Sequence, residues 1–230
     1  LQEQSQAQVF LSKRDLDTFQ TYIGGGCYYE FVKAQCLQAG WNQDLIKALA
    51  DDIKNIDILM RPYPHLTPLG EGAEINLAGY RYKTYPIPGH SDGHVVFGGI
   101  ENGWLLGGDN IIRHTILHLT DWPHTRLDNP LTEHLHSLQK LLIMKISLVL
   151  PGHGMSFANA AERIHLIEQH HERRKSQVLQ GLQEPTSAWD LAVRLFRDNS
   201  YIHIKRLILA ETLAYLNALV SERRVEVEER

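Results

Sequence analysis

Residues 88–94 read Pro-Gly-His-Ser-Asp-Gly-His, and this stretch does most to predict the fold. Two more glycine-rich turns follow it, Leu-Gly-Gly-Asp at 106–109 and Leu-Pro-Gly-His-Gly at 150–154. Each turn follows a stretch expected to form a β-strand, and each carries a side chain that can bind a metal ion. Because side chains just past strand ends can converge on one cleft, the three turns predict part of a two-metal hydrolase site.

This order of motifs resembles the metallo-β-lactamase superfamily, whose later motifs are Gly-His-Ser/Thr-x-x-Gly-His, a Gly-Asp after a hairpin, and Pro-Gly-His-Gly. The resemblance runs through nearly the whole chain and implies an α/β fold, the αββα sandwich of that family. It implies that His90 binds one metal ion, that Asp109 bridges two, and that His153 binds the other. It also implies two zinc ions as cofactors, and it places His94 beside them as a catalytic group that faces the substrate or supports the ligands.

The first motif of that family, His-x-His-x-Asp-His, does not occur between Leu1 and Arg230. The sequence begins at Leu1 rather than at methionine, and residues 1–11 resemble the helix and strand that usually come just after that motif. We therefore expect an N-terminally truncated sandwich. Two protein ligands would remain for each zinc, fewer than the three of ordinary catalytic sites, so we expect this chain to bind metal weakly and to be inactive.

For a protein with all its ligands, the resemblance implies a zinc-dependent hydrolase. Two zinc ions would lower the pKa of a shared water to about 7, and the hydroxide would attack an ester, thioester or related acyl substrate. Two alternatives stay open, a single-strand endoribonuclease and a non-catalytic binding or scaffold protein that keeps the three residues as relics. The fold serves thioesterases, lactonases, β-lactamases and nucleases, so it does not choose the substrate.

The composition is that of an ordinary globular protein. Its 230 residues are enough for one large core, or for a core with a small added domain. No apolar run approaches the roughly 18 residues needed to span a membrane, and no signal-peptide pattern opens the chain. Cys27 and Cys36 lack a metal or redox spacing and are expected to be buried or half-buried thiols. We therefore predict a cytoplasmic protein without membrane contact.

Apolar spacing and turn residues predict the elements that carry the motifs. Asn-Gly at 102–103 signals a tight turn between strands expected at 95–100 and 104–106. Asn-Pro at 129–130, an N-cap followed by proline, begins a helix. The other expected elements are a helix over 44–53, strands over 74–77 and 80–87, and a short buried strand over 146–150.

The pattern changes after Gly154, and we divide the chain into a metallo-β-lactamase-like domain, 1–158, and a second domain, 159–230. The second part resembles the small winged-helix domain of one branch of the superfamily. That branch commonly shows His-Arg-x-x-Arg in its long helix, and here His171 replaces the first arginine. Helices are expected over 160–182, 188–196 and 204–221, followed by a wing strand at Val225 and Val227.

A winged helix suggests nucleic acid as a partner, but the charges do not favour it. From Glu162 to Arg230 there are eleven Lys or Arg against eleven Asp or Glu, and the whole chain has a net charge of −4. We expect instead that this domain shapes the substrate cleft or supports a homodimer. A small-molecule acyl substrate is the partner that we expect first.

Eight further histidines and Asp92 are left out of the predicted site. Asp92 is expected to form the turn rather than to act as an acid. Histidines crowd the segment between the second and third turns, and two of them are only two residues apart on a helix, which prevents them from binding one ion together. The histidines left out are His114, His118, His124, His134, His136, His165, His170 and His171.

Overall fold

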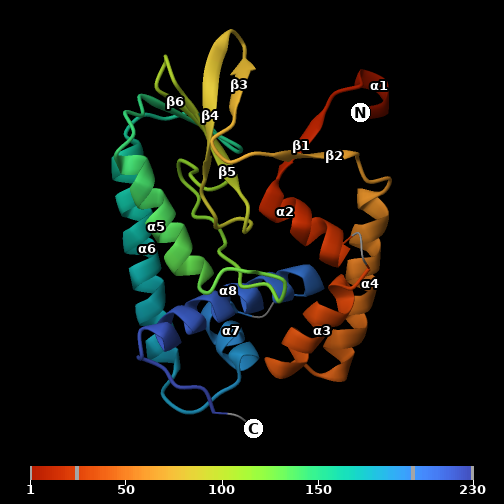
Figure 1. Ribbon diagram of the computed structural model, residues 1–230. Helices are drawn as coiled ribbons and strands as arrows, with labels where there is room; N and C mark the ends of the chain where they lie inside the picture. The colour runs from red at the N-terminus through yellow and green to blue at the C-terminus, as the bar shows by residue number, and fades with distance from the viewer. Residues whose placement is uncertain (1, 24–25, 198–199, 229–230) are drawn as a thin grey trace.

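The computed structural model describes residues 2–23, 26–197 and 200–228 of the chain (Figure 1). A five-stranded sheet in the order β3-β4-β5-β6-β7 forms its centre. Neighbouring strands are antiparallel as far as β6, and β7 runs parallel to β6. The strands are β3 (Glu74–Leu77), β4 (Tyr80–Pro86), β5 (Val95–Gly99), β6 (Trp104–Gly108) and β7 (Leu148–Pro151).

Two long helices, α5 (Pro130–Leu142) and α6 (Ala160–Gly181), lie side by side and pack against the sheet (Figure 1). The Asn129 side chain accepts a hydrogen bond from the backbone N–H of Thr132, so the predicted N-cap is confirmed. Alternate strand residues and one face of each helix form the core between them. Its fully buried members include Ile87, Val96, Leu105, Leu138, Val149 and Ile164.

The described residues up to Leu69 form a layer of helices with a small parallel ribbon. A second core joins α3, α4 and α8, and Trp41 and Leu49 are among its buried members. Asn42 caps α4, which continues to Met60, well past the expected end at 53. The elements are α1 (Gln2–Ser5), β1 (Val9–Ser12), α2 (Lys13–Thr18), the π-helical turn η1 (Phe19–Ile23), α3 (Tyr28–Gln38), α4 (Gln43–Met60) and β2 (Leu66–Leu69).

The three expected C-terminal helices are present, as α6, α7 (Ala188–Phe196) and α8 (Ile202–Ser221). The expected wing strand is wrong, because residues 222–228 form a turn and an irregular segment with no strand. Helix α8 crosses below the sheet and contacts both α4 and α5 (Figure 1). Leu209 of α8 belongs to the core of α3 and α4, and Tyr215 packs with Leu131 of α5. The domain boundary at 158/159 remains a prediction.

The two cysteines differ in their exposure to solvent. Cys36 is buried as expected, whereas Cys27 is exposed. In the part of the chain that the structure describes, no helix is both long and apolar enough to cross a membrane.

An ion pair links the loop after β6 to α8. Ring Nδ1 of His118 contacts the carboxylate of Glu211, a residue that is only 4% exposed. This hydrogen bond raises the pKa of His118 above its ordinary value of 6.5. The folded protein therefore favours the protonated ring, so the stabilisation is complete below pH 6.5 and is lost as the pH rises through the raised pKa.

We predict that His118→Gln makes the stability of the protein less sensitive to pH. Urea unfolding at about pH 6 and about pH 8.5 should show a larger loss of unfolding free energy in the unchanged protein than in the variant. The difference should be about 1 kcal/mol or less, because the His118 side chain is 63% exposed and solvent screens the pair. The same loss in both proteins would contradict the prediction.

Candidate metal site

Three side chains meet where β4, β6 and β7 end. Asp109 lies in the middle, with its Oδ2 3.7 Å from Nε2 of His90 and its Oδ1 3.6 Å from Nε2 of His153. Both imidazole side chains are largely exposed, at 53% and 78%, whereas the Asp109 side chain is 27% exposed. The structure thus brings together the three metal-binding candidates of the sequence, with one carboxylate oxygen toward each histidine.

The parallel pairing of β6 and β7 explains why Asp109 and His153 are neighbours. Gly108 lies opposite Pro151 in the register, and the N–H of Gly152 donates to the Gly108 carbonyl at 2.7 Å. A Cβ atom on Gly152 would lie 2.4 Å from Oδ1 of Asp109. Glycine is therefore required at 152 for the carboxylate to approach the turn this closely.

The spacing and chemistry of these donors fit two metal positions. Zinc binds histidine nitrogen and carboxylate oxygen at about 2.0–2.2 Å, so two donors of one ion lie roughly 3.4–3.7 Å apart at bond angles of about 110–125°. The two histidine–aspartate distances, 3.7 and 3.6 Å, agree with this separation. Among the described residues, no three His, Cys, Asp or Glu side chains form a group that could hold one ion. The described chain therefore supplies two donors to each position, one fewer than catalytic zinc usually has.

Asn110, which the sequence reasoning missed, fixes the loop of His90 against the turn that carries Asp109. Its side chain is buried, and its Oδ1 accepts a hydrogen bond from the backbone N–H of His90 at 3.1 Å. Its Nδ2 donates to the Ile87 carbonyl and lies 3.0 Å from Nδ1 of His94. Only a side-chain amide offers an acceptor and two donors at such positions. The one signal in the sequence was its place directly after the aspartate.

His94 is half-buried and stands against the backbone of the β6 turn. Burial first, and then the nearby charge of His90, lower the pKa of His94 to about 4, so its ring is neutral near pH 7. Asn110 donates to Nδ1, which leaves the proton on Nε2. A Cβ atom on Gly108 would lie 2.7 Å from that Nε2. This placement favours support of the loop over reaction with a substrate, and the catalytic role of His94 remains a prediction.

Two carboxylates fix the loop of residues 90–94, one from α2 and one within the loop itself. Asp15, near the start of α2, accepts hydrogen bonds from Ser91 Oγ at 2.6 Å and from the N–H of Gly93 at 2.8 Å. Asp92 accepts from the Thr125 hydroxyl and the Arg126 N–H, both in the loop between β6 and α5. Asp92 lies in the turn between Ser91 and His94, and its carboxylate joins that turn to the neighbouring loop, a contact that the sequence did not predict.

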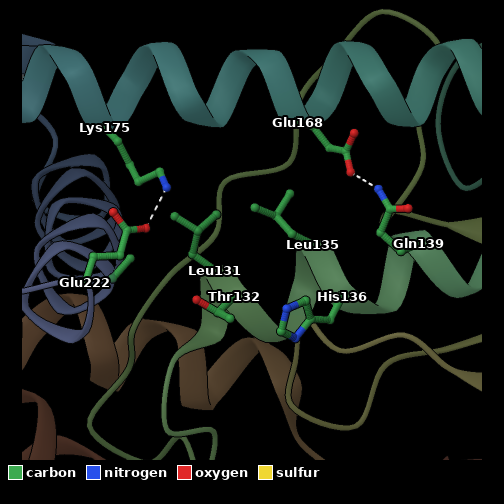
Figure 2. Close-up of a pocket in the computed structure, with 9 residues that line it drawn as sticks. Leu131, Thr132, Leu135, His136, Gln139, Glu168, Lys175 and Glu222 are labelled. Carbon is green, nitrogen blue, oxygen red and sulfur yellow. Dashed lines mark hydrogen bonds and ion pairs between the residues drawn. The ribbon is translucent and has the colours of Figure 1, made fainter.

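A hollow of about 240 Å³ lies elsewhere, between α5, α6 and the end of α8. Figure 2 shows leucines of α5 along it and a polar pair at each end, Lys175 with Glu222 and Gln139 with Glu168. None of the three candidate metal ligands lines this hollow. We therefore do not assign it to the site.

Comparisons with known proteins identify similar sequences and structures. The family model of the metallo-beta-lactamase superfamily matches residues 13–153. The lactamase-like protein notP of Aspergillus sp. (strain MF297-2) is 25% identical in an alignment of 174 residues that covers 69% of this chain and 50% of the relative. The atrochrysone carboxyl ACP thioesterase of Aspergillus fumigatus is 26% identical over 53% of this chain and 36% of the relative. The hydroxyacylglutathione hydrolase of Xylella fastidiosa is 30% identical over 43% of this chain and 35% of the relative.

The chain thus spans half or less of the length of these three curated relatives. The chain covers a larger share of one solved structure. A metallo-beta-lactamase family protein from Thermus thermophilus superposes on this chain with a TM-score of 0.82 at 28% identity. That superposition covers 94% of this chain and 67% of the other. Since so much of this chain is included, the shared fold extends into the C-terminal helices.

Proposed function

Because the chain belongs to the metallo-β-lactamase superfamily, we propose that it carries part of a dinuclear zinc site that hydrolyses an ester, a thioester or a related acyl substrate. The observation that carries the proposal is the position of Asp109 between two histidines, with one carboxylate oxygen toward each. A bridging carboxylate with a histidine on either side suits a pair of zinc ions that share one site.

Each residue of the site has a separate task in this proposal. Asp109 would hold both ions, while His90 and His153 would each bind one of them. Asn110 fixes the backbone of His90, and the neutral ring of His94 supports the turn before Asp109. Zinc bound there would make a water acidic enough to react at neutral pH and would polarise the acyl carbonyl.

The acyl substrate is supported by relatives and by charge. Two of the similar proteins are named a thioesterase and a hydroxyacylglutathione hydrolase, and both names describe the hydrolysis of an acyl group. An endoribonuclease would need a basic channel, whereas the charges of the C-terminal part balance. Acyl hydrolysis is therefore the activity that we propose.

The number of ligands sets what this chain should do by itself. The sequence contains no His-x-His-x-Asp-His, and the described residues supply two donors to each position. We predict that purified chain with added zinc does not hydrolyse an acylglutathione thioester or a nitrophenyl ester. A version extended upstream in its own reading frame should hydrolyse at least one of them and should bind zinc.

The same assay distinguishes the alternatives. Cleavage of a single-stranded RNA oligonucleotide without ester or thioester hydrolysis by the extended version would make the endoribonuclease the better interpretation. If neither version bound zinc, a non-catalytic binding role would replace the hydrolase. An Asp109→Asn variant of the extended version is the control, because any activity that survives it does not come from this site.

A further inference from the structure

A pair of buried histidines lies next to the loop that carries His90, and the proposed chemistry does not use it. His134 of α5 is 0% exposed and His171 of α6 is 1% exposed. Their rings meet edge to face, with centroids 6.2 Å apart and planes at 82°. Within the described part of the chain, Nε2 of each ring is buried without a hydrogen-bond partner. A buried polar atom without a hydrogen-bond partner costs free energy, so the presence of two such atoms needs an explanation.

The contacts of His134 lead to the metal loop. Its Nδ1 lies 3.1 Å from the carbonyl oxygen of Pro88, two residues before His90. Burial lowers the pKa of His134 to about 4, so the ring is neutral near pH 7. Because a carbonyl can only accept, Nδ1 carries the proton and donates it to this bond. A Cβ atom on Gly89, whose φ is +154°, would lie 2.3 Å from the same Nδ1. The ring thus occupies the space that any side chain at 89 would need.

The contacts of His171 lead to the C-terminal helices. Its Nδ1 lies 2.7 Å from the hydroxyl of Tyr215 in α8, and Tyr215 is 1% exposed. Burial lowers the pKa of His171 to about 3 and raises the pKa of Tyr215, so both groups are neutral near pH 7. Buried contacts therefore run without interruption from α8 through α6 and α5 to Pro88.

We propose that His134 is a positioning residue for His90, and that His171 and Tyr215 hold it in place. Pro88 already has a restricted φ, and the hydrogen bond from His134 fixes the orientation of its carbonyl. Asn110 fixes the next part of the loop through the N–H of His90. The C-terminal helices thereby set the conformation of the metal loop, whether or not zinc is bound.

Amide hydrogen exchange of the unmodified chain and of variants at 134 tests this inference. His134→Phe keeps a ring but removes the donor, and we expect the N–H groups of Gly89 and His90 to exchange about tenfold faster. His134→Asn keeps a donor at the δ position and should return most of the protection. Leu138→Ala, one turn further along α5 and equally buried, is the matched control. It should destabilise the whole protein without a selective effect on the loop.

The pattern of exchange separates a positioning role from a merely structural one. Faster exchange confined to residues 87–94 supports the proposal, whereas a uniform rise that includes β5 and β6, or no change, overturns it. If phenylalanine prevents folding, His134→Gln, which carries its amide one bond further out, replaces it with the same expectation. Tyr215→Phe should also raise loop exchange, by about threefold, and an unchanged loop would show that α8 has no part in positioning His90.

Discussion

Replacing Asp109 with asparagine should weaken zinc binding at both positions by at least about a hundredfold. The amide keeps the size of the side chain but removes the negative charge, and its NH₂ group cannot act as a ligand where Oδ1 or Oδ2 stood. Because each histidine faces a different oxygen of the same carboxylate, one substitution affects both positions. Changes that only disturb the support of a ligand already cost about 10–100-fold in affinity, so the loss of the shared ligand should cost more.

The measurement for this variant is equilibrium dialysis against a series of zinc concentrations. Asp128→Asn is the matched control, because it removes the same charge from an exposed position outside the site. Equal zinc binding by the unmodified chain and by the Asp109 variant would show that the carboxylate is not a ligand. Loss of binding in both variants would mean that overall charge, rather than the site, retains the ion.

Replacing Asn110 with alanine should lower the free energy of unfolding by about 2–4 kcal/mol. The change removes the acceptor for the His90 N–H and the donor to the Ile87 carbonyl, and it leaves the buried Ile87 carbonyl without this hydrogen bond. Urea unfolding gives the value directly. Asn110→Asp keeps the acceptor but loses the donor, so it should also be clearly destabilised.

Asn76→Ala is the control for this prediction, because Asn76 is an exposed residue of β3. Its change in unfolding free energy should stay within about 0.5 kcal/mol, as is usual for exposed positions. If Asn110→Ala were equally mild, the hydrogen bonds of Asn110 would not hold the loop, and another contact would have to do so.

The candidate ligands could be predicted because each lies in a short glycine-rich motif that resembles a motif of the family. His90, Asp109 and His153 come after β4, β6 and β7. These three strands run in the same direction, so their C-terminal ends lie at the same end of the sheet. Local signals also predicted the hairpin turn at 102–103 and the start of α5, because tight turns and helix caps depend on a few neighbouring residues.

The supporting residues could not be predicted, because their roles depend on contacts between distant segments. Nothing near His134 in the sequence indicates that its ring meets Pro88, 46 residues away. Asn110 likewise reaches Ile87 across the sheet edge. The wing strand failed for a related reason. Alternation at Val225 and Val227 describes a strand only if another strand pairs with it, and residues 222–228 have none in the described sheets.

The most direct test of the two-position site is the zinc-to-chain ratio at saturation, measured by elemental analysis after dialysis. We predict a ratio approaching two for the unmodified chain at high zinc. The ratio should be near one for His90→Ala and for His153→Ala, because each histidine serves only one position. A saturating ratio of one in the unmodified chain, or ratios that neither substitution lowers, would contradict a site with two metal positions.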